Sequence, residues 1–208
     1  MTGRKTPIAV LISGRGSNFE ALYRATRDGR LPARIVLVLS NVPTAAGIEH
    51  ARSLGLHTAV VPSRRAGSRA AHEARVREEI KRAGAEWICL AGYMRLLGAE
   101  FVAAFPNRIL NIHPSLLPSF PGLDVQQAAL DHGVRVSGCT VHLVDAGLDS
   151  GPIVGQRAVD VRSGDDADSL ARRILRQEHE LYPDALRRLL TEGWRIEGRR
   201  VLFDPPAD

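Results

Sequence analysis

Cysteine is scarce in this sequence, with only Cys89 and Cys139 among 208 residues. Each lies inside an apolar stretch, at Trp87–Ala91 and Ser137–Val144, and neither has the spacing to other ligands that a metal site requires. We therefore predict no metal and no disulfide framework. Buried, reduced thiols fit a cytoplasmic protein.

Long hydrophobic runs are also missing, since no apolar stretch approaches the ~20 residues that spanning a bilayer requires. The sequence has no internal repeat, no low-complexity tract and no linker. With 44% hydrophobic residues the chain can bury a substantial core. We predict a single domain over residues 1–208, cytoplasmic and without a membrane contact, and leave monomer and homodimer open.

The positive charge is spread rather than concentrated. A net charge of +5 and a sequence pI near 9.8 raise the question of nucleic acid, because a basic face attracts phosphates over long distances. The arginines are dispersed from Arg4 to Arg200 and interrupted by acids, and no basic helix is interleaved with aromatics. This favours small anionic ligands over a nucleic-acid groove, although an arginine-rich surface without a specific ligand is an equal alternative.

Short apolar runs alternate with segments of helical periodicity in the first half. The runs are Ile8–Ile12, Ile35–Leu39, Thr58–Val61, Trp87–Ala91 and Ile109–Ile112. The helical segments are Phe19–Arg27, Ala46–Leu54 and Ser68–Ala83. Strands without polar alternation, separated by helices, predict an α/β fold with a Rossmann-like open, mostly parallel sheet and helices on both faces. Ligands then gather at the carboxyl ends of the strands.

The second half changes character after a proline-rich loop at residues 114–122. Ser137–Val144 and Ile153–Val159 predict two late antiparallel strands. A long amphipathic helix is expected over Asp166–Leu190, and Trp194–Phe203 predicts a terminal hairpin that turns at Glu197 and Gly198.

The loop after the first strand has the features of an anion site. It reads Ser13-Gly-Arg-Gly-Ser-Asn18 before a helix, so that backbone amides and the helix dipole face a ligand. Ser17 and Glu20 match a capping box. The third glycine of a dinucleotide fingerprint is replaced by Phe19, and no lysine follows as in a phosphate-loop motif. A single phosphate therefore fits better than NAD or ATP, and a plain tight turn is the alternative.

A second polar cluster is expected at the end of the strand before Pro114. Asn111 and His113 stand two residues apart and so project from one face of the strand. An amide and an imidazole together suit stabilisation of an oxyanion at a carbonyl. A strand-ending asparagine beside a histidine bonded to a carbonyl is the structural alternative. Asp149 lies in a turn between the late strands, where carboxylates usually bond their own backbone.

Four segments of the chain occur in a familiar order, at residues 11–18, 90–97, 110–118 and 148–153. They read Leu-Ile-Ser-Gly-Arg-Gly-Ser-Asn, Leu-Ala-Gly-Tyr-Met-Arg-Leu-Leu, Leu-Asn-Ile-His-Pro-Ser-Leu-Leu-Pro and Leu-Asp-Ser-Gly-Pro-Ile. Together they resemble the phosphoribosylglycinamide formyltransferases, folate-dependent enzymes of purine synthesis. The resemblance spans essentially the whole chain, and the Asn-x-His-Pro segment is the most specific part.

The resemblance implies transfer of a formyl group from 10-formyltetrahydrofolate to the amine of glycinamide ribonucleotide. It implies a catalytic group of Asn111, His113 and Asp149. The residues it assigns to the substrate are Gly16, Ser17, Asn18 and Glu178, the first three at the phosphate and the last at the amine. The residues it assigns to the folate are Arg69, Met94, Arg95, Leu96, Leu97 and Asn111. From sequence alone, Glu178 is more typical of a solvated helix face.

The chain departs from the family pattern in two places. The segment at residues 123–127 lacks the histidines often found there, so no catalytic residue is assigned to it, and Arg15 replaces a small or amide residue. His142 either lines the pocket or is a structural strand histidine. Three alternatives remain: a formyltetrahydrofolate hydrolase, a methionyl-tRNA formyltransferase, and a non-catalytic phosphate- or folate-binding module.

Overall fold

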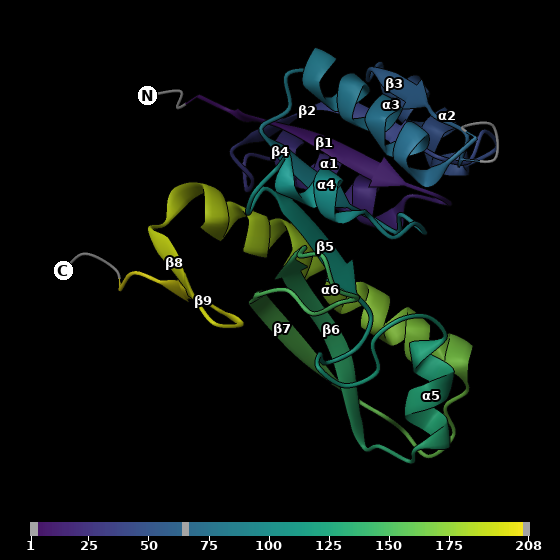
Figure 1. Cartoon of the computed structure of the whole chain (residues 1–208). Helices are drawn as coiled ribbons and strands as arrows, with labels where there is room; N and C mark the ends of the chain where they lie inside the picture. Colours follow the sequence, from purple (N-terminus) through teal and green to yellow (C-terminus); the bar gives the residue numbers. More distant parts are fainter. Residues whose placement is uncertain (1–3, 64–66, 206–208) are drawn as a thin grey trace. The chain divides into compact units, whose positions relative to one another are not determined.

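The computed structural model describes residues 4–63 and 67–205, and the chain divides into two compact units. The first unit is Met1–Asn111 and the second is Ile112–Asp208 (Figure 1). The prediction of a single domain over the whole chain stays a prediction.

A parallel sheet forms the centre of the first unit. Its strands are β1 (Thr6–Ile12), β2 (Ala33–Ser40), β3 (Thr58–Val60), β4 (Trp87–Leu90) and β5 (Ile109–His113), which runs on into the second unit. Their order is β3-β2-β1-β4-β5, and each neighbouring pair is parallel. Residues 7–12 of β1 and all of β4 are buried, as expected for inner strands covered on both sides.

Helices connect these strands along the chain. They are α1 (Ser17–Arg27), α2 (Ala46–Ser53), α3 (Arg69–Arg82) and the short α4 (Ala99–Ala103). α3 begins where expected, because the Ser68 side chain accepts a hydrogen bond from the Ala71 amide at 3.1 Å and caps the helix. α4 was not predicted, since five residues are too few to show a helical period.

The strand order reverses between β1 and β4. From β1 the chain builds outward through β2 and β3, and it then returns to place β4 on the other side of β1. Open α/β sheets bind ligands at such a reversal, beyond the carboxyl ends of the strands. The segments that follow β1 and β4, at residues 13–16 and 91–98, are therefore the first unit's candidate binding loops.

The second unit carries the late strands. They are β6 (Val136–Leu143), β7 (Ile153–Asp160), β8 (Trp194–Glu197) and β9 (Arg200–Phe203), in the order β6-β7-β9-β8. β6 and β7 are antiparallel, β9 is parallel to β7, and β8 and β9 form an antiparallel hairpin. The predicted mostly parallel α/β sheet with late antiparallel strands and a terminal hairpin is confirmed.

Two helices belong to the second unit. The 25-residue helix α6 (Ala167–Thr191) packs on β6 and β7, and it begins with a capping box between Asp166 and Ser169. The seven-residue helix α5 (Val125–Asp131) contacts α6 and was not predicted. Its N-cap residue, Asp124, has a left-handed backbone (φ 53°), which helical periodicity does not reveal.

Candidate active site

The loop after β1 is built on a left-handed glycine. Gly16 has φ 79° and is the N-cap of α1, and its carbonyl accepts from the Glu20 amide at 2.9 Å. The predicted capping box is wrong, because Ser17 is already the first helical residue and no side chain caps the helix. The Glu20 side chain instead pairs with Arg24. The N-cap residue therefore contributes no side-chain hydrogen bond to the first turn of α1, and a helix N-terminus after a parallel strand favours an anion.

A second glycine makes room for this loop. The Gly47 amide donates to the Gly14 carbonyl at 3.1 Å. A Cβ on Gly47 would lie 2.5 Å from Ile12 Cδ1 and 3.1 Å from the carbonyls of residues 14 and 15, so only glycine fits there. α2 therefore packs directly against the loop and fixes the position of Gly16, Ser17 and the buried Asn18.

Ser13 joins the two candidate binding loops of the first unit. Its hydroxyl donates to Asn41 Oδ1 at 2.5 Å and accepts from the Met94 amide at 2.8 Å, while its own amide donates to the Gly92 carbonyl at 3.0 Å. The loop after β1 and the loop after β4 are therefore one bonded structure. The sequence placed Ser13 in the candidate anion loop but did not reveal its bonds to Asn41 and Met94, because these residues are distant along the chain.

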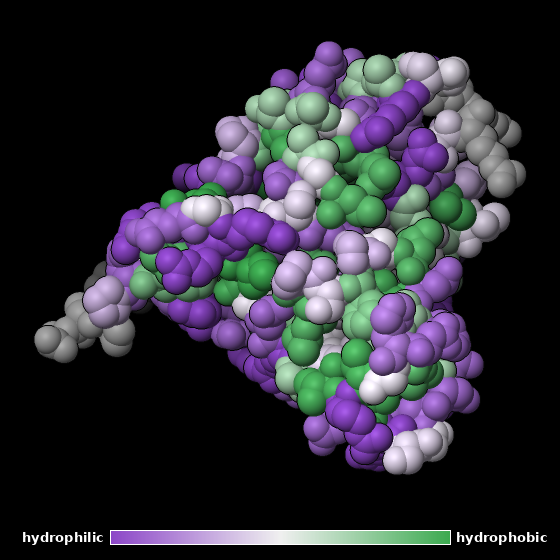
Figure 2. Space-filling view, turned by 60° about the horizontal axis from the view of Figure 1, so that its bottom comes forward, coloured by the Kyte–Doolittle hydropathy of each residue, from purple (hydrophilic) through white to green (hydrophobic). Residues whose placement is uncertain are grey.

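The segment after β4 presents apolar side chains to the surface. Met94 is 65% exposed and Leu96 is 61% exposed, Arg95 is exposed, and Leu97 is partly covered. Figure 2 shows apolar patches interspersed with hydrophilic surface on the face it presents. Exposed apolar side chains on a loop held by hydrogen bonds can cover a flat ring system, and the contact of this segment with a pterin stays a prediction.

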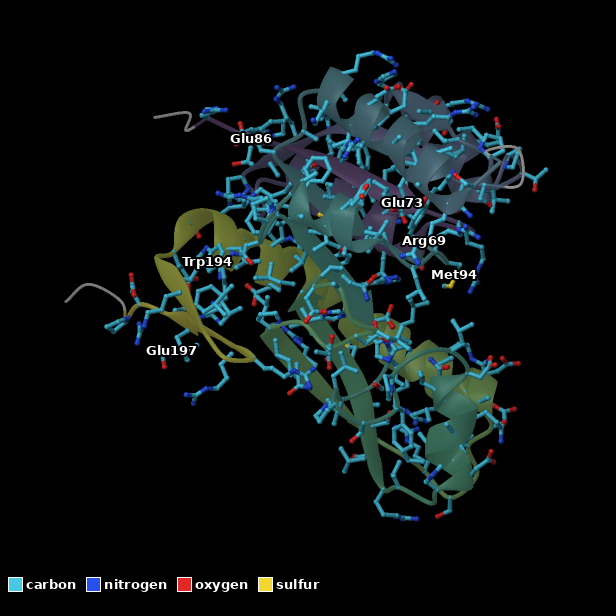
Figure 3. All side chains as sticks on the ribbon, in the orientation of Figure 1. Arg69, Glu73, Glu86, Met94, Trp194 and Glu197 are labelled. Carbon is cyan, nitrogen blue, oxygen red and sulfur yellow. The ribbon has the colours of Figure 1, made fainter. Side chains whose placement is uncertain are left out.

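Helix α3 braces that segment from behind. Glu73 Oε1 accepts from the Gly98 amide at 2.8 Å, and a Cβ on Gly98 would lie 2.7 Å from Glu73 Oε2. His72 Nε2 contacts the Tyr93 hydroxyl at 3.0 Å inside the unit. Arg69 pairs with Glu73 at 2.8 Å and is half exposed (Figure 3). This ion pair holds the Arg69 guanidinium beside Glu73, which also bonds the Gly98 amide.

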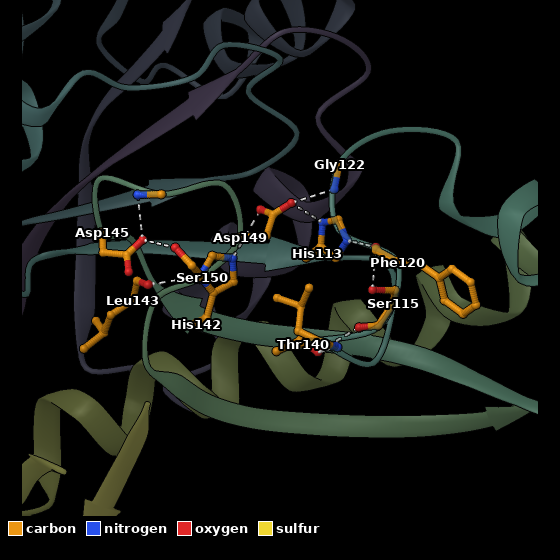
Figure 4. A network of polar contacts seen from close by, with 12 residues as sticks. His113, Ser115, Phe120, Gly122, Thr140, His142, Leu143, Asp145, Asp149 and Ser150 are labelled. Atoms are coloured by element: carbon orange, nitrogen blue, oxygen red, sulfur yellow. Dashed lines mark hydrogen bonds and ion pairs between the residues drawn. The ribbon is translucent and has the colours of Figure 1, made fainter. Parts of the chain in front are cut away.

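In the second unit the imidazole of His113 is buried at the end of β5. Its Nε2 lies 2.9 Å from the Phe120 carbonyl, which also accepts from the Ser115 hydroxyl at 3.0 Å (Figure 4). The loop that carries Phe120 is tied to β6, since Thr140 Oγ1 donates to the Ser115 carbonyl at 2.7 Å and accepts from the Leu117 amide at 3.0 Å. These hydrogen bonds hold the proline-rich loop in place, and its Phe120 carbonyl orients the His113 ring.

Asp149 lies beside two histidines. Its Oδ2 is 3.5 Å from His113 Nδ1 and accepts from the Gly122 amide at 2.9 Å, and its Oδ1 is 3.7 Å from His142 Nε2 (Figure 4). The carboxylate therefore does not simply bond its own turn, which was the structural alternative. The interpretation that His142 lines the same site is supported, because its ring is buried and faces Asp149.

The ionisation of the pair follows from competing effects. Burial lowers the pKa of His113, the Phe120 carbonyl and the Asp149 charge raise it, and His142 lowers it; the net direction is downward. Burial raises the pKa of Asp149, but the His142 ring, the Gly122 amide and the charge of His113 outweigh it and lower the pKa overall. The expected attraction of Asp149 is present, yet a charged His113 in the free protein is not supported, because desolvation outweighs that attraction.

Two residues that contact the His113 ring have a strained backbone. Phe120 has φ 53° and Asp149 has φ 48°, in the left-handed region that side-chain-bearing residues rarely adopt. Such conformations persist only where the surroundings hold them, and they concentrate at functional sites. Here they aim the Phe120 carbonyl and the Asp149 carboxylate at the same imidazole.

Asn111 and Glu178 complete the predicted set. Asn111 is the last residue of the first unit and lies on β5, two residues before His113, with a partly exposed side chain. Glu178 lies on α6 and is 7% exposed, which excludes the alternative of a solvated helix face. Its charge acts on Cys139 of β6, where burial first and Glu178 second raise the thiol pKa to about 12. A buried carboxylate on this helix is a stronger candidate for a specific role.

No helix in residues 4–63 and 67–205 is long and apolar enough to cross a membrane. Over the same ranges, no group of three or more His, Cys, Asp or Glu side chains is arranged to hold a metal ion. Cys89 and Cys139 are buried and form no disulfide.

Known proteins are similar to this chain in sequence and in fold. The formyl transferase family matches residues 6–186. The chain is 38% identical to the phosphoribosylglycinamide formyltransferase of Escherichia coli, over 96% of this chain and 92% of that protein. A solved glycinamide ribonucleotide transformylase from Symbiobacterium toebii superposes with a TM-score of 0.94 at 49% identity, covering 97% of this chain and 95% of that one.

A longer relative is also similar. The trifunctional purine biosynthetic protein adenosine-3 of Drosophila melanogaster is 46% identical over 91% of this chain, which spans 14% of that protein's length. The family match over residues 6–186 includes Gly16, His113 and Asp149. The chain therefore belongs to the formyl transferase family.

Proposed function

We propose that this protein transfers a formyl group from 10-formyltetrahydrofolate to the amine of glycinamide ribonucleotide, a step of purine synthesis. The carboxylate of Asp149, 3.5 Å from the buried ring of His113, is the observation that carries the proposal. Family membership and the names of its relatives support the chemistry. The proposal assigns no role to a metal.

The two loops of the first unit would hold the two substrates. Gly16, Ser17 and Asn18 would bind the ribonucleotide phosphate, because the first turn of α1 offers backbone amides and the positive end of a helix dipole. The segment Met94–Leu97 would cover the pterin, and Arg69 would exchange its pairing with Glu73 for the acidic end of the folate. Glu178 would position the attacking amine.

The reaction would pass through a tetrahedral intermediate. The amine lone pair forms a bond to the formyl carbon while the carbonyl π electrons move to oxygen. Asn111 would donate a hydrogen bond to that oxygen, and His113 would do so after it has taken up a proton; each donor in such a site contributes about 3 to 4 kcal/mol to lowering the barrier. Collapse then breaks the bond from the formyl carbon to the folate nitrogen N10, which takes up the proton released by the amine.

His113 would carry that proton. Because its pKa is lowered, the ring is mainly neutral near pH 7 in the free protein and can accept a proton from the attacking amine. The adjacent Asp149 carboxylate then stabilises the imidazolium, and the ring returns the proton to N10. Both groups near the ring nitrogens, the Phe120 carbonyl and the carboxylate, are acceptors, so they favour the protonated ring once it forms.

The finer assignments follow from the same residues. We propose a single catalytic domain over the whole chain, since the family match crosses the boundary between the two units. Two buried cysteines that form no disulfide suit a reducing cytoplasm. The proposed ligands are small molecules, with no nucleic acid and no membrane; monomer and homodimer both stay open.

A spectrophotometric assay with purified protein tests the proposal. We expect 10-formyltetrahydrofolate to be converted to tetrahydrofolate only when glycinamide ribonucleotide is present, with formylated ribonucleotide formed in equal amount. Parallel reactions contain water alone or initiator methionyl-tRNA as acceptor. Release of formate without an amine acceptor would assign the chain to the hydrolases instead, and folate binding without turnover would indicate a binding module.

The phosphate loop gives a separate prediction. Gly16→Ala places a Cβ on a left-handed residue, 3.2 Å from Gly47 Cα, and strains the loop by about 1 to 2 kcal/mol. We expect the KM for glycinamide ribonucleotide to rise about tenfold with a smaller change in kcat, because the misplaced amides bind the substrate phosphate less well. Gly14→Ala is the matched control, since its Cβ would meet nothing within 4 Å. Equal effects of the two changes would remove Gly16 from this role.

A further inference from the structure

The terminal hairpin reaches the turn that carries Asp149. Arg199, in the turn between β8 and β9, donates from a terminal guanidinium nitrogen to the Asp149 carbonyl at 3.3 Å. The contact is fixed in register by the backbone, because the Ile153 amide donates to the Arg199 carbonyl at 2.8 Å and Ile153 pairs with Arg200. Arg199 and Arg200 thus lie beside the start of β7, directly after the Asp149 turn.

The other end of the hairpin is anchored on α6. Trp194 Nε1 donates to the Leu189 carbonyl at 3.0 Å, and the Arg188 guanidinium lies 3.6 Å from the centre of the Phe203 ring. Figure 3 shows Trp194 and Glu197 along this hairpin. These contacts fix the hairpin on α6, so its turn can hold another segment in place.

The Asp149 turn is well supported on one side. Asp145 Oδ1 accepts from the Ser150 hydroxyl at 2.7 Å and from the Gly147 amide at 3.0 Å. A Cβ on Gly151 would lie 1.9 Å from the Leu143 carbonyl, so the turn packs tightly against the end of β6. These contacts fix the residues before and after Asp149 but do not bond its carbonyl.

Asp149 itself needs that support, because its backbone is left-handed. Relaxation of the Asp149 backbone out of the left-handed region would move its carbonyl and swing the carboxylate relative to the His113 ring. The guanidinium of Arg199 opposes this movement by holding the carbonyl. We propose that Arg199 is a positioning residue, which keeps the Asp149 carboxylate directed at His113. The inference rests on the proposed function of Asp149.

The neighbouring arginines of the hairpin behave differently. Arg195 pairs with Glu197 at 2.9 Å and Arg200 lies 3.9 Å from the same carboxylate, so their charges are directed along the hairpin itself. Among the described residues, Arg199 forms no such ion pair, although an acid is as near in sequence. All three arginines are exposed, and the direction of the guanidinium distinguishes Arg199.

The test compares Arg199→Met with Arg200→Met. Each change removes one charge from the hairpin and keeps an unbranched apolar stem, but only the first removes the bond to the Asp149 carbonyl. We expect Arg199→Met to lower kcat about tenfold with both KM values unchanged, as for a lost charge-assisted hydrogen bond that acts on the transition state. We also expect the rising limb of kcat/KM against pH to move to lower pH, because a displaced carboxylate raises the His113 pKa less.

Three results would overturn the inference. These are wild-type kcat in Arg199→Met, an equal loss in Arg200→Met, and a loss of kcat with the pH limb unchanged, which indicates a merely structural contact. Arg199→Lys keeps a cationic donor and should recover part of kcat. Wild-type protein without formylation, or full activity in Asp149→Asn, would reject the proposed function instead, so the two failures are distinguishable.

Discussion

Replacement of His113 by alanine is expected to lower kcat by about 10²- to 10³-fold, because it removes both an oxyanion donor and the group that carries the proton. The KM values should change little, since neither the phosphate loop nor the segment Met94–Leu97 includes this residue. Steady-state kinetics with 10-formyltetrahydrofolate and glycinamide ribonucleotide measure the effect.

Folding should survive this change. The Phe120 carbonyl keeps the Ser115 hydroxyl as a donor at 3.0 Å, so His113→Ala should not leave it unsatisfied. We expect a loss of about 1 to 3 kcal/mol in the free energy of unfolding, measured by denaturant titration. His57→Ala removes an exposed histidine and serves as the control. Turnover at the wild-type rate in folded His113→Ala protein would exclude the residue from catalysis.

The stability of the wild-type protein should also depend on His113. Its pKa is lowered from 6.5 on folding, so below pH 6.5 the unfolded chain binds a proton that the folded chain does not. The free energy of unfolding should therefore fall as the pH is lowered through this region. In His113→Ala this part of the pH dependence should be absent.

Replacement of Asp149 by asparagine is the second change with a large expected effect. Asparagine preserves the shape and can still accept from the Gly122 amide, but it removes the charge beside His113. We expect kcat to fall by about 10²- to 10⁴-fold, as for carboxylates that orient a catalytic imidazole in serine proteases. The imidazolium that forms during the reaction would lose its nearest counter-charge.

The same replacement should shift the pH profile of kcat/KM in a defined direction. Asp149 raises the pKa of His113, so its neutral replacement should lower that pKa further. The rising limb of kcat/KM, which reports deprotonation of His113, should move to lower pH above a reduced plateau. Asp131→Asn controls for a general change in charge, because Asp131 is exposed on α5 and bonds Gln127. A limb that stays in place would show that Asp149 does not act through His113.

The sequence was sufficient for most of the fold. Apolar runs such as Ile8–Ile12 identified the inner strands, because a strand covered on both faces has no polar side. The periodicity of residues 166–190 located α6 within one or two residues. α4 and α5 were missed, since five and seven residues do not establish a period. The capping box at Ser17 failed because Gly16, in a left-handed conformation, takes the cap position.

The resemblance predicted two residues that lie close together in the second unit, but the sequence did not predict their ionisation. The resemblance named His113 and Asp149, which the structure brings to within 3.5 Å. The sequence could not show that His142 shares this carboxylate, or that Phe120 and Gly122 bind the pair through their backbones. The lowered pKa of His113 depends on burial by segments far apart along the chain, and for the same reason the sequence alone could not show that Glu178 is buried.

The boundary between the compact units falls within β5, between Asn111 and Ile112. A gene divided at this position would encode one half with residues 13–18, residues 94–97 and Asn111, and another with His113, Asp149 and Glu178. Neither fragment would hold the full set of groups proposed for the reaction. Formylation by a mixture of the two halves, and by neither alone, would therefore report their reassociation and could serve as a complementation assay.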